Sequence, residues 1–492
     1  MGDAGWKWVT LAVAGVSTVG LATSCWSLMK MARTRAQLRK AKDGSVADGP
    51  CPLPVLGNVW ELNAEGYYET LVKYRESPAP VFWVCTSPFL VLTTEESVRR
   101  VLEGSSNRYA KPRYFGYRSR AVQSAVETHK HAVAAKETVE NSDGGPLDSS
   151  RKALLQLVAD SIPTIREGVS KMISRLAQPS SSRDELMIIQ EEVVVLALDI
   201  LFGYRDREVA IRTARQIAFS GEEFARRMIN PFRAWMYGWT SIRFIVNVFG
   251  LIGLGRRLCR SLDRASSEGK QTWVHGWIGK VGRIGKLGKV VGLMMAATQT
   301  VPLTAVWMLL LVGSDPIVMD SLRREIKEVL GGKALEHATL EDYDRMKFTD
   351  YVIKETLRLY PPFPLLQREA QVDDVIGGLK IPQGTAVYVV PWMIHHSPTI
   401  WKNPDLFYPE RWIINEYHAD SPSDYAYIPF GRGPRMCAGS RLAMMELKIL
   451  LLSICYNFDI IPHSPLDTTA LPDMDMKPRN HPFSLIPIGS RQ

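Results

Sequence analysis

The chain has 492 residues, of which 46% are hydrophobic and 23% charged, and its formal net charge is +9. This composition is ordinary globular material with enough apolar residues for a large core, and no solenoid or propeller repeat is visible. The charge suits an anionic membrane or an acidic protein partner. We predict no nucleic-acid partner, because no RNP, zinc-finger or helix-turn-helix signature accompanies the charge.

The six cysteines are scattered without a CxxC pair, which argues against a zinc module and gives no disulfide framework. We expect reduced thiols that face the cytosol, one of which is a metal ligand. They are Cys25, Cys51, Cys85, Cys259, Cys437 and Cys455.

The N-terminal stretch from Trp8 to Met29 carries no charged residue. At about 1.5 Å per residue it matches the ~30 Å thickness of the hydrocarbon layer. Basic residues follow it, so the positive-inside rule leaves the rest of the chain in the cytosol. We therefore expect an uncleaved anchor in residues 1–30, with an organelle transit peptide as the alternative. A basic, proline-rich linker follows over 31–58, and a single large domain over 59–492.

Beyond the linker, two β-rich runs predict a hairpin around Ser87 and Pro88. Ile188 to Phe202 is apolar and predicts a buried helix that Gly203 ends. Residues 230–254 mix aromatic and basic side chains, which is typical of a membrane-interface segment or of an amphipathic surface helix.

Four glycines at every third position from Gly279 to Gly288 make a poor helix, which we expect to be the frayed entry to an apolar helix from Val290 to Val312. The rest of the chain alternates between predicted helices and a hairpin. The helices are Asp320 to Leu330, Phe348 to Tyr360 and Arg441 to Cys455, and the hairpin is Asp374 to Pro391.

The segment with the most distinctive chemistry is a loop rich in glycine and proline that carries Cys437 just before the last helix. Backbone N–H groups at a helix N-terminus favour a thiolate, and glycines let the backbone approach a flat cofactor closely. Arg435 is placed to pair with an anionic group such as a heme propionate. The full run is Pro429, Phe430, Gly431, Arg432, Gly433, Pro434, Arg435, Met436, Cys437, Ala438 and Gly439.

This run resembles the heme-binding loop of the cytochrome P450 superfamily, with Cys437 at the position of the iron ligand. The resemblance implies a mainly α fold with small β-sheets (α+β), heme b as cofactor, and contacts from Phe430, Gly431 and Gly439. It also places Arg368 where the family often contacts a propionate.

The resemblance extends upstream of the loop. Glu355 and Arg358 lie three residues apart on one helix face. In this family the matching pair joins an arginine of a Pro-Glu-Arg segment, here Arg411, in a buried network under the heme loop. Trp412 stands where phenylalanine is commoner.

The family's long central helix carries an acid and an alcohol that relay protons to bound dioxygen. Here the alcohol is kept as Thr300, whereas Gln299 replaces the acid. Glutamine organises water but donates no proton as a carboxylic acid does. The family's Trp-x-x-x-Arg is also missing, since no Trp stands between Arg108 and Leu155. Lys130, Lys136 and Arg151 are candidates to replace its arginine.

The resemblance implies a monooxygenase that inserts one atom of O2 into a lipophilic substrate of the fatty acid, sterol or terpenoid class. Its electrons come from an NADPH-dependent reductase, and it lies in the endoplasmic reticulum membrane as a single-pass protein with a cytosolic domain. Gln299 motivates one alternative, an isomerase or dehydratase of lipid peroxides that needs no reductase. A non-catalytic heme-binding membrane protein is the second alternative.

Overall fold

The computed structural model describes residues 80–84, 87–103, 108–110, 146–178, 185–217, 242–269, 273–279, 281–363, 365–413, 424–463 and 483–488, with a few isolated positions before them. Apart from such positions, the predicted anchor and linker lie outside the described residues.

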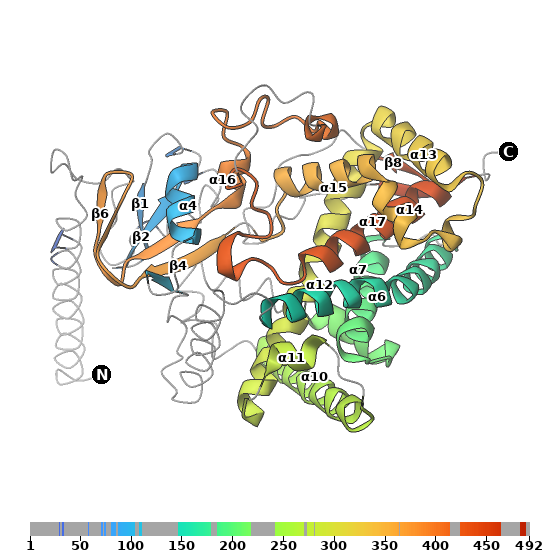
Figure 1. Ribbon diagram of the computed structural model, residues 1–492, viewed down its shortest axis with the longest axis horizontal. Coiled ribbons are helices and arrows are strands. Elements are labelled where there is room, and N and C mark those ends of the chain that lie inside the picture. Colours follow the sequence, from blue (N-terminus) through green and yellow to red (C-terminus); the bar gives the residue numbers. More distant parts are fainter. Residues whose placement is uncertain are drawn as a thin grey trace, which may run out of the picture.

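Helices make up most of the described chain (Figure 1). The α-helices are α4 (Glu95–Glu103), α6 (Pro146–Leu176), α7 (Glu185–Phe202), α10 (Ile242–Ser267), α11 (Trp273–Ile278), α12 (Arg283–Gly313), α13 (Pro316–Leu330), α14 (Leu340–Arg345), α15 (Lys347–Leu359), α16 (Pro391–His395) and α17 (Ser440–Asn457). The short 3-10 helices are η1 (Leu335–His337), η2 (Pro409–Trp412) and η4 (Gly433–Arg435).

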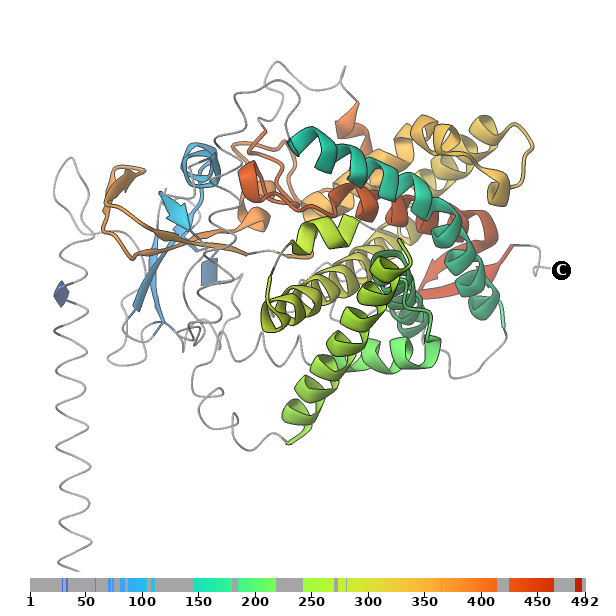
Figure 2. The same cartoon turned by 60° about the horizontal axis from the view of Figure 1, so that its bottom comes forward.

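The strands form one five-stranded sheet in the order β1-β2-β7-β4-β3 and two two-stranded antiparallel sheets, β5-β6 and β8-β9. They are β1 (Val81–Val84), β2 (Ser87–Leu92), β3 (Tyr109–Ala110), β4 (Leu366–Ala370), β5 (Asp374–Ile376), β6 (Leu379–Ile381), β7 (Ala386–Val389), β8 (Phe458–Pro462) and β9 (Phe483–Pro487). In both views the larger sheet and α4 lie to one side of the helices (Figures 1 and 2). The mainly α fold with small sheets is thus confirmed.

The long helix α12 runs through the middle of the helical part and packs on α7, α10, α15 and α17. It is apolar on all sides, which fits a helix buried in the core of a large domain. Within the described chain it is the one helix long and apolar enough to cross a membrane, but 67% of that window is buried in the protein. Trp307 stacks on Tyr360 with ring centroids 3.6 Å apart, which joins α12 to the end of α15.

Local sequence signals set several helix ends. Asp315 caps α13 by accepting hydrogen bonds from the N–H groups of Ile317 and Val318, and Gly331 ends the helix at a φ of 55°. Gly203 ends α7 in the same left-handed way, at a φ of 60°. Only glycine adopts this conformation at little cost, so the sequence predicts these ends well.

The predicted hairpin at Ser87 is confirmed as β1 and β2, although Ser87 and Pro88 belong to β2 itself. The hairpin predicted over Asp374 to Pro391 is only half right. Its first two strands pair with each other as β5 and β6, but β7 leaves them to pair with β2 and β4. The central helix also begins earlier than predicted, at Arg283, so it takes in Gly285 and Gly288.

Candidate functional site

The residues before α17 form a tight loop that carries Cys437. The Cys437 N–H donates to the carbonyl oxygen of Phe430 at 2.9 Å. Gly431 and Gly433 have φ angles of 70° and 75°, which favour glycine. A Cβ added at Gly439 would lie 3.9 Å from the sulfur of Cys437. The thiol therefore lies against backbone at the N-terminus of α17.

The expected lowering of the Cys437 pKa is only partly right. Cys437 is exposed as a whole residue, but the atoms packed around its sulfur keep water from it and raise the pKa of the thiol, whereas a hydrogen bond from the Gly439 N–H lowers this pKa by a smaller amount. The net result is a raised pKa, because the described residues place backbone N–H groups but no cation close to the sulfur. A metal ion at the sulfur would supply that positive charge and displace the proton.

Arg368 and Arg435 form a pair of like charges beside this loop. Arg368 is only 8% exposed, and its guanidinium donates to the neighbouring Gln367 carbonyl at 2.8 Å. Arg435 is half-buried and donates to the Tyr109 carbonyl at 3.1 Å. Burial and the charge of Arg435 together lower the pKa of Arg368 to about 10. Among the described residues no carboxylate pairs with either arginine, so the pair is suited to an anionic ligand.

The structure brings the predicted network residues together around Glu355, which is 0% exposed. Its carboxylate accepts both Nε and Nη2 of Arg358, at 3.0 and 2.9 Å, and Nε of Arg411 at 2.8 Å. It also accepts the Tyr408 N–H at 3.1 Å and the indole N–H of Trp412 at 3.0 Å. These donors take the place of the water that the buried carboxylate loses.

The two residues predicted on the distal helix lie on α12 with their polar groups engaged. The Thr300 hydroxyl donates to the Ala296 carbonyl one turn back, at 3.1 Å. The Gln299 carboxamide donates to the Ile217 carbonyl at 3.2 Å, at the end of the helical segment 207–217. In the structure Gln299 therefore ties α12 to a neighbouring segment.

Three residues around this site make contacts that the sequence did not predict. His395 is fully buried and links α15 to the segment before the loop, because it contacts the Arg358 carbonyl and accepts the Ile428 N–H at 2.9 Å. Tyr109 and Asp374 lie behind Arg435 and bond to each other. No local signal identifies them, since the partners are far apart in the sequence.

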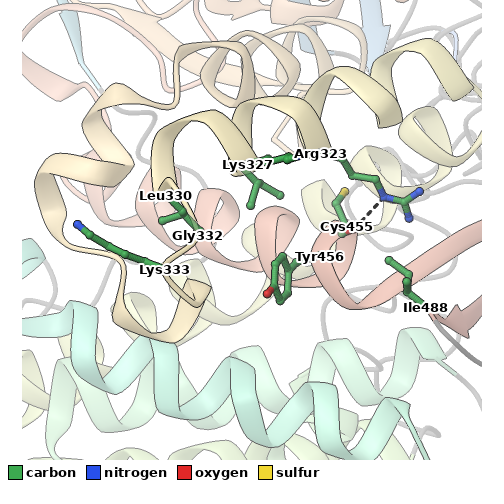
Figure 3. A pocket seen from close by; sticks show the side chains of 9 residues that line it. Arg323, Lys327, Leu330, Gly332, Lys333, Cys455, Tyr456 and Ile488 are labelled. Carbon is green, nitrogen blue, oxygen red and sulfur yellow. Dashed lines mark hydrogen bonds between the residues drawn. The ribbon is translucent and has the colours of Figure 1, made fainter.

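A separate surface pocket lies at the other end of α17 (Figure 3). Arg323 donates there to the Cys455 carbonyl at 3.1 Å. Since α17 has 18 residues, its two ends are about 27 Å apart. This pocket is therefore not part of the site around Cys437. Its lining residues are Arg323, Ile326, Lys327, Leu330, Gly332, Lys333, Cys455, Tyr456 and Ile488.

The sequence pattern of the cytochrome P450 family matches residues 286–483, which contain every candidate site residue discussed above from α12 to the cysteine loop. Over this part of the sequence the chain matches the cytochrome P450 superfamily. It is 36% identical to mouse cytochrome P450 4V2 over 175 residues, which are 35% of this chain and 33% of that protein. It is 34% identical to cytochrome P450 71B14 of Arabidopsis thaliana over 203 residues, 40% of each chain. Pluviatolide synthase of Podophyllum peltatum is 24% identical over 475 residues, covering 90% of this chain and 92% of the relative.

The alignment with the mouse cytochrome P450 spans about a third of that relative's length. Cytochromes P450 bind heme b through a cysteine thiolate, and the residues described above fit that group. A single thiol lies against the backbone of Gly439, where no side chain intervenes. The guanidinium groups of Arg368 and Arg435, which have no carboxylate partner among the described residues, match the two propionates in charge. Most of the stretch from Arg108 to Leu155, where the family's Trp-x-x-x-Arg is expected, lies outside the described residues; of the three candidate replacements, Lys130 and Lys136 lie outside them and Arg151 falls in α6.

Proposed function

We propose that this protein is a heme-thiolate monooxygenase that inserts one atom of O2 into a lipophilic substrate. The observation that carries the proposal is that the loop with the Cys437 thiol also holds Arg435, which lies near the buried Arg368, and that neither arginine has a carboxylate partner in the described chain. A bound heme would supply dioxygen activation, which an electron-donating thiolate promotes.

On the ligand side, Cys437 would hold the iron, and Arg368 and Arg435 would hold the propionates. Phe430, Gly431 and Gly439 would shape the surface against the ring. The network around Glu355 supports this arrangement because Arg411 and Arg358 fix the chain segments that lead to the loop.

On the distal side, Thr300 would hold and pass a proton at its hydroxyl oxygen. This hydroxyl now donates to the Ala296 carbonyl, and its oxygen keeps lone pairs that accept a hydrogen bond from water. Gln299 would act beside it by ordering water, and its side chain has no acidic proton to give. Proton delivery would therefore depend on Thr300 and ordered water.

We further propose that a membrane-bound NADPH-dependent reductase supplies the electrons. The net charge of +9 supports docking of an acidic flavoprotein. The uncharged stretch from Trp8 to Met29 and the basic residues after it support a single-pass protein of the endoplasmic reticulum with a cytosolic domain. A substrate of the fatty acid, sterol or terpenoid class fits an enzyme held at a bilayer.

Gln299 favours one other reaction on the same scaffold, the rearrangement or dehydration of a lipid peroxide without reductase or O2. The observation that favours this alternative is that position 299 has no acidic side chain, because rearrangement of a peroxide needs no proton delivery to dioxygen.

Turnover assays with candidate lipids separate these functions. The proposed monooxygenase forms product only with reductase, NADPH and O2, and Thr300→Val lowers the product formed per NADPH consumed. Product from a lipid hydroperoxide alone would favour the rearrangement. Heme binding without a substrate-induced spin-state shift and without substrate-coupled NADPH consumption would favour a non-catalytic heme protein.

A further inference from the structure

Arg435 depends on a very short strand for its place in the site. Its Nη1 donates to the carbonyl oxygen of Tyr109 at 3.1 Å. Tyr109 belongs to β3, which has two residues and pairs with Ala370 and Glu369 of β4. Arg368 precedes these two residues on β4. The pair β3–β4 therefore supports both arginines of the candidate site.

The Tyr109 side chain is buried and is held by Asp374. It is 1% exposed, and its hydroxyl donates to Asp374 at 2.7 Å. The Asp374 side chain is only 4% exposed and is paired with Arg100 and with Arg108, the latter at 3.2 Å. Burial opposes the ionisation of Asp374, but hydrogen bonds from Arg100, Tyr109 and the Val375 N–H outweigh it and hold its pKa well below the usual range.

The same cluster is tied to the cysteine loop through α4. Arg100 of α4 donates a hydrogen bond to Asp374. Two residues further along α4, the Leu102 carbonyl oxygen packs so closely on Gly433 that a Cβ added there would lie only 2.2 Å from it. The Gln371 N–H also donates to the Arg108 carbonyl at 2.9 Å. Because a two-residue strand has few ladder hydrogen bonds of its own, these side-chain contacts determine where β3 lies.

We propose that Tyr109 and Asp374 are positioning residues for the anionic side of the cofactor. The ion-paired Asp374 fixes the Tyr109 ring, which fixes the Tyr109 carbonyl and keeps the Arg435 guanidinium beside Arg368. This inference rests on the proposed function, since the anion held by the two arginines is the heme propionates. Tyr109 and Asp374 would thus help to retain the heme through Arg435, without contacting the heme themselves.

The test uses the full chain and Tyr109→Phe, which removes one hydroxyl and keeps the ring. The readout is the rate of heme transfer to an excess of apomyoglobin, with the thiolate Soret band of the carbon monoxide complex as a check of the fold. Losing this hydrogen bond to a carboxylate is expected to speed heme loss about tenfold. Tyr456→Phe is the matched control, because Tyr456 is 47% exposed at the other end of α17. It should leave the rate unchanged.

A double-mutant cycle separates positioning from general stability. If Tyr109 acts through Arg435, Tyr109→Phe has no further effect on heme loss in an Arg435→Gln background. An unchanged rate in the single variant, or an equal acceleration in both backgrounds, overturns the inference. If Tyr109→Phe does not fold, the rate of heme loss is measured for Asp374→Asn instead, alone and in the Arg435→Gln background, and is judged by the same criteria. Wild-type protein that holds no heme would instead overturn the proposed function, and this inference with it.

Discussion

Trp412 donates its indole N–H to Glu355 at 3.0 Å, so the tryptophan that replaces the family's commoner phenylalanine adds a donor to a fully buried carboxylate. Trp412→Phe keeps an aromatic ring but removes this donor. The loss of a hydrogen bond to a charged group is expected to cost about 1.5–3 kcal/mol in the free energy of unfolding.

Urea denaturation of the two proteins measures this difference. Trp401→Phe is a suitable comparison, because the buried Trp401 indole N–H has no hydrogen-bond partner among the described residues. That variant should cost less. Equal losses in the two variants would show that Trp412 contributes through packing alone.

His395 predicts a dependence of stability on pH. The Ile428 N–H donates to Nε2, so the neutral ring carries its proton on Nδ1, which donates to the Arg358 carbonyl at 3.0 Å. Burial, with the charges of His396 and Arg358, lowers the pKa of His395 well below its usual value. Below about pH 6.5, His395 therefore binds a proton in the unfolded chain but stays neutral in the folded chain.

The stability that His395 contributes is therefore complete above about pH 6.5 and is lost as the pH falls, by about 1.4 kcal/mol per pH unit. His396, whose pKa burial lowers to about 3, adds a similar slope. His395→Gln should be less stable at neutral pH but should lose stability less steeply on acidification. Parallel curves for wild type and variant would refute this assignment.

Gly433 predicts a steric effect at the loop. Its φ is 75°, and an added Cβ would lie 2.2 Å from the Leu102 carbonyl oxygen. Gly433→Ala should therefore lower stability by about 1–3 kcal/mol from backbone strain, with a further loss from the clash. Gly292→Ala is the control, because Gly292 lies inside α12 with open space at its Cβ position. It should stabilise the protein by about 0.5–1 kcal/mol, and a Gly433→Ala variant of wild-type stability would contradict the described loop.

Gln299 predicts an order of stabilities rather than a single loss. Gln299→Ala removes the donor to the Ile217 carbonyl, which is worth about 1 kcal/mol. Gln299→Glu should be worse, because it sets a carboxylate oxygen against a carbonyl oxygen. Denaturation midpoints should fall in the order Gln, Ala, Glu. A Glu variant as stable as wild type would mean that the contact with Ile217 does not hold α12.

Local sequence patterns predicted those parts of the site that lie within a single helix or loop. The spacing of Glu355 and Arg358 was visible on one helix, and the glycines around Cys437 marked the loop. Contacts between distant segments were not predictable in this way. Tyr109 and Asp374 are brought together by β3, β4 and β5, and the pKa of Cys437 depends on burial that its neighbours in sequence do not reveal. For the same reason β7 was assigned to a local hairpin although it pairs with β2.

We propose Cys437 as the thiolate ligand of a heme. The reduced carbon monoxide difference spectrum of wild type beside Cys437→Ser and Cys437→Ala tests this assignment. We expect the Soret band typical of thiolate ligation in the wild type only. The same band in either variant, or wild-type protein purified without heme, would contradict the claim.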